Sequence, residues 1–293
     1  IKALNDHIKR NGLKASVEDG LTKASYRLKY QIIGSPMVSI IIPTKNHHED
    51  IERIINSINS KSSLQNFEII IVDNNSDDPL SIEYFDSLTG KIKVIKYQKE
   101  FNFSAINNFA VRHANGEHII FLNNDTEVIA ENWIESMLEF SQQDRVGAVG
   151  SLLLFPDNSI QHAGVVLGIG RMAGHSYKGK SSVNPGVLDM NLTIRNISAV
   201  TAACMMMKKD LFTDIGGFDE NLVVALNDIE LCIRLLDRGY TNIYTPFSRL
   251  YHYESKTRGY EDTLEKRQRL LSESSYVINK WSRYLDSDRF YNP

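Results

Sequence analysis

Short apolar runs recur four times between residues 38 and 122, and helical patterns alternate with them along this part of the chain. The runs cover residues 38–42, 68–72, 92–97 and 118–122. Continuous runs rich in β-branched residues are typical of parallel strands that are buried on both faces. Strands that alternate with helices predict a Rossmann-like α/β fold, in which helices flank a mostly parallel or mixed sheet.

Three of these runs end abruptly in polar residues. The polar endings are Pro43 and Thr44 after the first run, Asp73 and Asn74 after the second, and Asn123, Asn124 and Asp125 after the fourth. Open α/β sheets bind ligands beyond the carboxyl ends of their strands, so we expect these side chains to converge on one site. Taken alone, residues 123–126 also fit a turn followed by a helix N-cap, because Asn, Asp and Thr are favoured in both.

The sequence contains no glycine-rich phosphate loop. G-x-G-x-x-G does not follow the first apolar run, and G-x-x-x-x-G-K-[ST] occurs nowhere in the chain. Proteins without such a loop commonly bind phosphates through a divalent cation, and carboxylate oxygen is the ligand that Mg²⁺ prefers. Asp125 is therefore the candidate ligand of a cation that would hold a diphosphate.

Composition excludes several classes of protein. The chain has 293 residues, 42% hydrophobic and 24% charged, which is ordinary for a soluble globular protein. Its net charge of −3 gives no basic field for nucleic acid, so we expect no nucleic-acid partner. No apolar run approaches the roughly 18 residues of a membrane span, and no signal peptide is visible. The first residue is Ile, so we expect a processed chain or a fragment of a longer polypeptide.

The two cysteines, Cys204 and Cys232, lie in apolar stretches without C-x-x-C spacing. Buried free thiols in a reducing compartment are therefore favoured over a disulfide. With the neutral-to-acidic charge, this favours a cytoplasmic location.

We expect the chain to consist of three parts, with the first boundary marked by Gly and Pro residues. Residues 1–36 form a lead-in, with a short helix at 3–10 and an edge strand near 26–32, closed by Gly-Ser-Pro. Residues 37–260 form one domain, with a nucleotide-binding half at about 37–127 and an acceptor-binding half at about 128–260. Residues 156–197, rich in Gly, Ser and Asn, show little pattern, which is typical of a functional or disordered loop. Residues 261–293 form a C-terminal helical segment.

Five short motifs occur in order along the chain. They are VSIIIPT at 38–44, IVDNNS at 71–76, FLNND at 121–125, GGFDE at 216–220 and NDIE at 227–230. Together they resemble the inverting nucleotide-sugar glycosyltransferases of glycosyltransferase family 2, and most of all the branch that builds bacterial O-antigen, capsule and rhamnose-type polysaccharides. The resemblance covers roughly residues 36–260 and implies the GT-A fold.

The resemblance also implies a nucleotide site. Its residues are Pro43, Thr44, Asn46, Asp73, Asn74, Ser76, Asn107, Asn123, Asn124 and Arg258. Asp73 and Asn74 are implied to bind the base and ribose, and Arg258 the diphosphate. The donor is implied to be a UDP-, dTDP- or GDP-linked sugar.

A metal site is implied at Asn123-Asn124-Asp125, which stands where the family has Asp-x-Asp. Asp125 would be a ligand of Mn²⁺ or Mg²⁺, and the first carboxylate of the motif is Asn in this chain. His252 stands where related enzymes supply a late histidine to the same metal. A hydrogen-bonded sheet histidine is the alternative reading of His252.

Asp228 is implied to be the catalytic base. Inverting transfer is a single displacement in which an acceptor hydroxyl must lose its proton, so a carboxylate must lie within hydrogen-bond reach of it. Asp228 begins a predicted helix, whose dipole favours negative charge there, although a helix N-terminus often carries a carboxylate with no further role. The residues implied for the acceptor and donor sugars are His162, His175, Thr201, Gly217, Asp219 and Glu220. For Thr201 and its neighbours, plain core is the alternative.

The implied acceptor is a glycan or lipid-linked glycan, and further domains of a longer polypeptide are implied partners. A cytoplasmic enzyme resting at the inner face of the plasma membrane fits such an acceptor. A catalytically idle glycosyltransferase-like module is an alternative function, supported by Asn123 in the altered motif. A nucleotidyltransferase fits less well, because residues 43–46 lack its Gly-rich basic loop.

Overall fold

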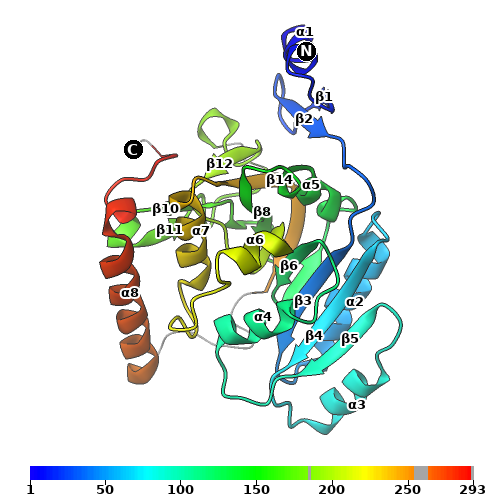
Figure 1. Cartoon of the computed structure of the whole chain (residues 1–293), viewed down its shortest axis with the longest axis vertical. Helices are drawn as coiled ribbons and strands as arrows, with labels where there is room; N and C mark the ends of the chain where they lie inside the picture. Colours follow the sequence, from blue (N-terminus) through cyan, green and yellow to red (C-terminus); the bar gives the residue numbers. More distant parts are fainter. Residues whose placement is uncertain (184–185, 254–262, 292–293) are drawn as a thin grey trace.

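The computed structural model of the chain describes residues 1–183, 186–253 and 263–291. Within these residues a ten-stranded mixed sheet forms the centre, and helices cover both of its faces (Figure 1). The strands are β3 (Val38–Thr44), β4 (Phe67–Asp73), β5 (Ile92–Lys96), β6 (His118–Leu122), β7 (Thr126–Val128), β8 (Val146–Leu154), β9 (Ile160–His162), β12 (Arg195–Ile197), β13 (Cys204–Lys208) and β14 (Thr241–His252). The predicted α/β architecture is confirmed.

The order of the strands brings distant segments of the chain together. It runs β12-β14-β8-β13-β6-β3-β4-β5, while β7 pairs with β14 and β9 pairs with β8. β3 is parallel to β4 and β6, β4 is parallel to β5, and β8 is parallel to β14. β13 is antiparallel to both β6 and β8, so it joins the two parallel parts. The carboxyl ends of β3, β4 and β6 therefore lie at one edge.

Helices pack on both faces because both faces of the strands are apolar. α2 (His48–Lys61) and α5 (Trp133–Ser141) cover one face, and α4 (Phe103–Val111), α6 (Lys209–Asp214) and α7 (Asn227–Asp237) cover the other. Successive strand residues point to opposite faces, so Ile40 and Ile42 pack on the α2 side and Ile41 on the α4 side. All three are fully buried, which explains why this run shows no polar alternation.

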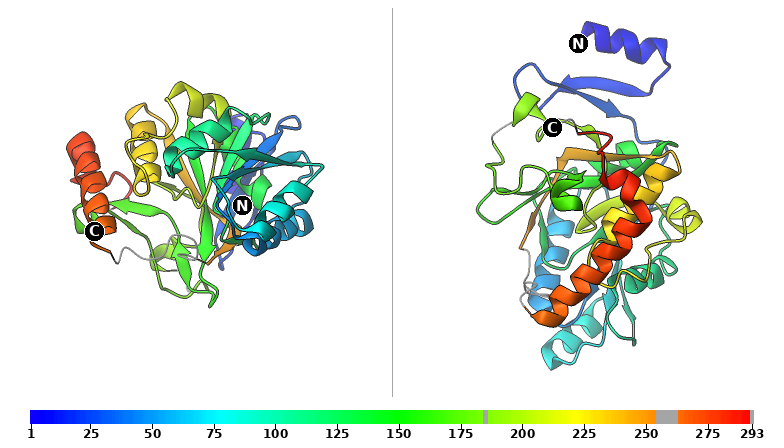
Figure 2. Two further views of the ribbon diagram at one scale, coloured as in Figure 1. Left: turned by 90° about the horizontal axis from the view of Figure 1, so that it is seen from below. Right: turned by 90° about the vertical axis from the view of Figure 1, so that its left-hand side faces the viewer.

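Two helices lie at the sides of the sheet. α3 (Pro79–Ser87) follows β4, and its first turn is capped by the Asp78 carboxylate, which accepts from Ser81 N. α8 (Leu264–Leu285) runs beside α7, on the side of the molecule away from α2 and α3 (Figures 1 and 2). Among the residues described, no helix combines the length and the apolar character that crossing a membrane requires.

Residues 156–197 are more ordered than their composition predicts. They contain β9, β10 (Val165–Leu167), β11 (Ala173–His175) and β12, together with the short 3₁₀ turns η1 (Ile169–Arg171) and η2 (Val187–Asp189). β10 and β11 pair with each other, and β9 and β12 add to the central sheet. Each of these strands has three residues, which is too short to show a period of two, and this is why the pattern was not visible.

The N-terminal segment stands apart from the body (Figure 2). α1 (Lys2–Arg10) precedes an antiparallel hairpin of β1 (Ala15–Asp19) and β2 (Tyr26–Tyr30), so the strand expected near 26–32 pairs with β1 instead of with the central sheet. Arg27 attaches the hairpin to the body, because it forms a buried ion pair with Glu139 and stacks 4.0 Å from the ring of Phe247.

Cys204 and Cys232 are both buried and free. Burial raises the pKa of the Cys204 thiol to about 12, although a hydrogen bond with Ser151 works against the shift. Burial also raises the pKa of Cys232. Both thiols are thus core side chains and poor nucleophiles at neutral pH.

Candidate functional site

The polar ends of β3, β4 and β6 meet as predicted. Thr44 and Asp73 are register partners. The backbone N–H of Asn74 donates to the Thr44 carbonyl at 2.8 Å, and Asn124 Nδ2 donates to Thr44 Oγ1 at 3.1 Å. Three strand ends are therefore tied together at Thr44, which is buried.

Most of the predicted nucleotide-binding residues form one hydrogen-bond network. Asn46 N donates to Ser76 Oγ at 2.7 Å, and Ser76 N donates to Asp73 Oδ1 at 2.9 Å. Asn74 Nδ2 donates to the carbonyls of Tyr97 and Lys99. Asn46 has a left-handed backbone with φ of 58°, which Asn tolerates better than most residues and which turns the chain from β3 towards α2. Pro43 lies beside this network near the end of β3, half-buried.

Asn107 lies away from this network, and Arg258 is not among the described residues. Asn107 is fully buried on α4, where its Nδ2 donates to the Phe103 carbonyl and its Oδ1 makes no hydrogen bond within the described part of the chain.

Asp125 and His252 form a buried pair. Asp125 Oδ1 lies 3.2 Å from His252 Nε2, and the side chains are 8% and 7% exposed. β7 pairs with β14 so that Thr126 stands opposite His252, and Tyr253 N donates to the Asp125 carbonyl at 2.8 Å. Burial opposes the charged form of Asp125, but His252, with a contribution from Arg53, outweighs it and lowers the pKa of Asp125 below its ordinary value. The sheet therefore brings the two predicted metal ligands together from positions 127 residues apart in sequence.

The pair fits a divalent cation. Asp125 Oδ1 is buried and faces His252 Nε2 at 3.2 Å, so an anionic oxygen and an imidazole nitrogen converge on one point, where a cation can replace the proton between them. Asn123 Nδ2 lies 3.4 Å from His252 Nε2, and an amide in this place can present either its oxygen or its nitrogen. No third His, Cys, Asp or Glu completes a metal cluster within the described ranges, so the other ligands would come from the amide, water or the diphosphate.

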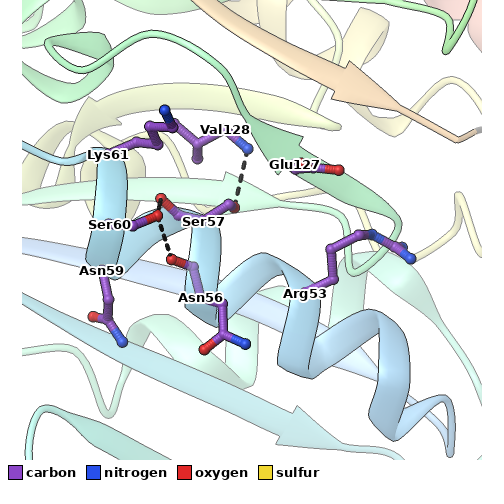
Figure 3. Close-up of a pocket in the computed structure, with 8 residues that line it drawn as sticks. All are labelled: Arg53, Asn56, Ser57, Asn59, Ser60, Lys61, Glu127 and Val128. Atoms are coloured by element: carbon purple, nitrogen blue, oxygen red, sulfur yellow. Dashed lines mark hydrogen bonds between the residues drawn. The ribbon is translucent and has the colours of Figure 1, made fainter.

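A groove of about 660 Å³, lined mainly by polar residues, lies between α2 and β7 (Figure 3). Its β7 side is formed by Glu127 and Val128, which follow Asp125 along the chain. Ser57 Oγ accepts from Val128 N at 3.0 Å, and this bond fixes β7 on α2. Arg53 stacks 4.5 Å from the Tyr253 ring, and Tyr253 OH donates to Glu127 Oε2 at 2.6 Å. None of the predicted site residues lines this groove.

Asp228 opens onto a separate cavity of about 230 Å³. The cavity is lined by Val165, Ala173, Gly174, His175, Val224, Ala225, Leu226, Asn227, Asp228 and Ile229. Asp228 stands in the first turn of α7, as predicted. Its Oδ2 accepts from Ala202 N at 3.1 Å, and its Oδ1 accepts from Ile229 N at 2.8 Å. The carboxylate is thus held by backbone amides at the wall of a small cavity that presents both polar and apolar surface.

One short stretch of backbone connects Asp228 with the Asn123–Asp125 turn. Ala202 N donates to Asp228, and the carbonyl of the next residue, Ala203, accepts from Asn123 N at 3.1 Å. Thr201 Oγ1 accepts from Ala203 N at 3.3 Å and so stabilises the stretch.

His162 and His175 contact each other. Their Nδ1 atoms are 2.8 Å apart, so one ring must donate a proton to the other. His162 is fully buried on β9, whereas His175 on β11 is half-buried and lines the Asp228 cavity. Burial lowers the pKa of His162 well below its ordinary value, and the nearby His175, Arg195 and His252 lower it further. His162, which burial keeps neutral, therefore contacts the histidine that lines the Asp228 cavity.

Gly217, Asp219 and Glu220 are not brought to the Asp228 cavity. Asp219 and Glu220 line a second cavity of about 360 Å³. Asp219 Oδ2 accepts from Tyr276 OH at 2.7 Å and from Lys280 Nζ at 2.8 Å. Burial opposes ionisation of Asp219, but these donors hold its pKa below the ordinary value. Gly217 has φ of 70°, and a Cβ there would come within 2.5 Å of Asn108 Oδ1. These residues attach the GGFDE turn to α4 and α8.

Sequence patterns did not single out Glu273. This residue lies on α8 and is 5% exposed. A usable signal was present, since Glu273 stands four positions before Val277 and so shares its inward face of the helix. A carboxylate on the buried face of a helix requires a partner.

Two solved structures of sugar-transferring enzymes share the fold. Mannosyltransferase PcManGT from Pyrobaculum calidifontis, in complex with GDP-Man and Mn²⁺, superposes with a TM-score of 0.59 at 19% identity over 84% of this chain and 65% of that one. GalNAc-T7 with UDP, GalNAc and Mn²⁺ superposes with a TM-score of 0.68 at 16% identity over 96% of this chain and 56% of that one. The expected GT-A fold is confirmed.

Sequence comparison finds longer relatives. O-antigen biosynthesis protein RfbC of Myxococcus xanthus is 34% identical over 298 residues, which take in 100% of this chain and 23% of that protein. The chain spans a third or less of the length of the curated relatives that match it from end to end. The family profile described as glycosyl transferase family 2 matches residues 39–216. That match takes in more than half of the 293 residues, and the chain therefore belongs to glycosyl transferase family 2.

Proposed function

We propose that the chain transfers a sugar, with inversion, from a nucleoside-diphosphate sugar to a hydroxyl of a glycan, with Asp228 as the catalytic base. One observation carries the proposal, namely that Ala202 and Ala203 hold both parts of the site. Ala202 N donates to Asp228 Oδ2 at 3.1 Å, and the Ala203 carbonyl accepts from Asn123 N at 3.1 Å. The base and the turn that carries Asp125 thus lie against one piece of backbone, as a displacement at a single carbon requires.

Asp228 takes the proton from the attacking hydroxyl. In an inverting displacement the hydroxyl attacks the anomeric carbon while the nucleoside diphosphate leaves from the opposite face. The base must lie within hydrogen-bond reach of the hydroxyl. The two backbone amides on Asp228 orient its carboxylate and leave further acceptor capacity on each oxygen. The N-terminal end of α7 favours its negative charge.

Asp125 and His252 hold a Mn²⁺ or Mg²⁺ ion, which when bound supplies Lewis-acid stabilisation of the charge that develops on the leaving diphosphate. Asn123 and Asn124 position these ligands, since Asn123 contacts His252 and Asn124 donates to Thr44. Arg258 adds positive charge to the diphosphate in this proposal. Support for the metal comes from the buried Asp125 oxygen that faces His252 Nε2 at 3.2 Å and from the Mn²⁺ in both structural neighbours.

The nucleoside lies at the carboxyl ends of β3 and β4 in this proposal. Asn46, Asp73, Asn74 and Ser76 share a network there, with Pro43 and Thr44 supplying backbone, and Asn107 supports the same end from α4. The donor is UDP-, dTDP- or GDP-linked. His162, His175 and Thr201 border the donor and acceptor sugars, because His175 lines the Asp228 cavity.

The acceptor in this proposal is a glycan or lipid-linked glycan of a bacterial cell-surface polysaccharide. Similarity to an O-antigen biosynthesis protein, over the whole of this chain and 23% of that protein, supports that setting. Residues 37–127 bind the nucleotide and residues 128–260 the acceptor. The enzyme then works in the cytoplasm at the inner face of the plasma membrane, where such acceptors are presented.

Replacement of the base tests the proposal. Asp228→Asn keeps the size of the side chain and removes its capacity to take a proton. We expect turnover, measured as release of nucleoside diphosphate from the donor, to fall by about 10² to 10⁴. Nucleoside-diphosphate affinity is expected to stay unchanged. Asp210→Asn is the matched control, because Asp210 is an exposed carboxylate in the first turn of α6.

Near-normal turnover of Asp228→Asn would remove Asp228 as the base. Equal losses of turnover and nucleotide affinity would point to a folding defect or a binding role. Nucleotide binding without any transfer by the natural chain would favour the idle module.

A further inference from the structure

The loop that leads to Asp228 has no regular secondary structure of its own. Residues 223–225, the 223–225 loop, connect the GGFDE turn with α7 and form part of the wall of the Asp228 cavity. Backbone amides in such a loop need partners from elsewhere when water is excluded. The position of Asp228 therefore depends on what the loop is bonded to.

Glu273 of α8 binds all three amides of this loop. Val223 N and Val224 N donate to Glu273 Oε1 at 2.9 and 3.1 Å, and Ala225 N donates to Oε2 at 2.8 Å. The carboxylate is 5% exposed. Buried hydrogen bonds to a charged acceptor are stronger than neutral ones and are little weakened by solvent. The buried Glu273 carboxylate is thus paired with backbone amides of the 223–225 loop.

The carbonyl side of the same segment is held by α4. Phe103 N donates to the Val223 carbonyl at 2.8 Å, and Ser104 Oγ donates to the Leu222 carbonyl at 2.7 Å. Phe103 and Ser104 are the first residues of α4, where backbone amides lack partners within the helix. The loop is therefore fixed from two sides, by α4 and by α8.

Leu226 connects the 223–225 loop directly to α7, the helix that carries Asp228. It has φ of 62°, a left-handed conformation that a branched apolar residue adopts only when its surroundings impose it. Its carbonyl accepts from Glu230 N at 2.9 Å and so begins α7. Asp228 follows two residues later. A shift of the loop at Ala225 would thus move the start of α7 and the Asp228 carboxylate with it.

We propose that Glu273 is a positioning residue for transfer: it holds the 223–225 loop in the geometry that aims Asp228 into the acceptor cavity. The inference rests on the proposed function, in which Asp228 is the base. Glu273 bonds to the loop backbone and does not line the Asp228 cavity. α8 therefore belongs to the catalytic unit although it lies outside residues 39–216, which carry the family match.

Glu273→Gln tests this role, because the amide keeps the shape but one of the two oxygens becomes a donor that faces a backbone N–H. Two quantities are measured on the full chain: hydrogen exchange of the Val223, Val224 and Ala225 amides, and kcat for nucleoside-diphosphate release from the donor that the natural chain uses. We expect faster exchange of these amides and a kcat that is about 10- to 100-fold lower. Donor affinity is expected to remain unchanged. Glu265→Gln is the matched control, since Glu265 is exposed on the same helix.

Glu273→Asp is a second variant, for the case that Glu273→Gln does not fold. It keeps the charge with a shorter reach, so it should show the same two changes to a smaller degree, and it decides the question where Glu273→Gln does not fold. Unchanged exchange would show that Glu273 does not hold the loop, and faster exchange with normal kcat would show that the loop does not aim Asp228. Either result overturns the inference. Failure of the proposed function looks different, because the natural chain itself would then release no nucleoside diphosphate.

Discussion

The proposed cation site has one carboxylate, Asp125, where the family motif Asp-x-Asp has two, so it offers a cation less negative charge. Asp125 contributes one negative charge, Asn123 contributes none, and His252 must be neutral to act as a ligand. A divalent ion on this pair keeps a net charge near +1. Firm binding is then expected only when a diphosphate supplies further oxygens, so metal and nucleotide should bind cooperatively.

His118 predicts a pH dependence of stability at the scale of one residue. It is 5% exposed at the start of β6, and its Nδ1 lies 2.8 Å from Ser141 Oγ. Burial, with a smaller effect of Lys208, lowers the pKa of His118 to about 4 from 6.5. The native state keeps the ring neutral while the unfolded state binds a proton below about 6.5, so stability falls as pH falls from 6.5 towards 4. At pH 5 this amounts to about 2 kcal/mol.

Urea unfolding of His118→Gln at pH 7 and pH 5 checks the prediction. The variant should lose about 2 kcal/mol less than the natural chain between the two pH values, whatever its stability at pH 7. His7→Gln, at an exposed position on α1, should lose as much as the natural chain. Equal losses in all three proteins would contradict the assignment of a neutral buried His118.

At the scale of elements, a buried ion pair anchors the N-terminal hairpin, together with the contact between the Tyr30 and Phe140 rings. Arg27 and Glu139 are 4% and 2% exposed, and the packing of Arg27 on Phe247 fixes β2 against the body. Arg27→Ala leaves the Glu139 carboxylate buried and unpaired, which costs about 3–5 kcal/mol. The hairpin should become sensitive to limited proteolysis near residues 20–25, and the free energy of unfolding should fall.

A surface ion pair between the two strands of the hairpin provides the control. Lys29 and Glu18 lie 3.1 Å apart with 45% and 42% of their side chains exposed. Lys29→Ala should therefore cost less than about 1 kcal/mol. The double variant Arg27→Met with Glu139→Leu should recover most of the loss, because a well-packed apolar pair can replace a buried ion pair. A loss in Lys29→Ala as large as in Arg27→Ala would show that the ion pair is not the anchor.

Elements with a local signal could be predicted from the sequence. β3, β4 and β6 are continuous apolar runs, and the polar residues that end them mark the edge where the site forms. β9 to β12 could not be predicted, because strands of three residues have no measurable period. The insertion of β13 between β6 and β8 is a long-range pairing that no local pattern reports.

The same limit applies to the site. Asp125 and Asp228 stand in short motifs, and His252, which lies in none of them, meets Asp125 through the pairing of β7 with β14. Glu273 contacts backbone amides 48 to 50 residues away, and backbone amides have no sequence signature. Asp219 and Glu220 lie in a motif, yet Asp219 bonds to α8 and Glu220 bonds to Asn108 of α4, and neither lines the Asp228 cavity.

At the scale of the molecule, the sheet order places the nucleotide network and the Asp125–His252 pair on one edge, so ligand binding should stabilise the whole fold. A ligand at 100 times its dissociation constant adds about 2.7 kcal/mol to the free energy of unfolding. Thermal unfolding with UDP, dTDP or GDP, each with and without Mn²⁺, is the measurement. We expect one of the three to raise Tm by several degrees, and only together with the metal.

Two variants sharpen this experiment. Asp125→Ala removes the anionic ligand and should abolish the effect of Mn²⁺ on the Tm shift, whereas Asp228→Asn should keep the full shift because the base does not bind the nucleotide. A shift that is the same with and without Mn²⁺ would mean that side chains alone bind the diphosphate, which contradicts the metal site. Absence of any shift would contradict nucleotide binding at this edge of the sheet. A shift that survives in Asp125→Ala with its metal dependence intact would place the cation on other residues, since His252 alone cannot retain it against water.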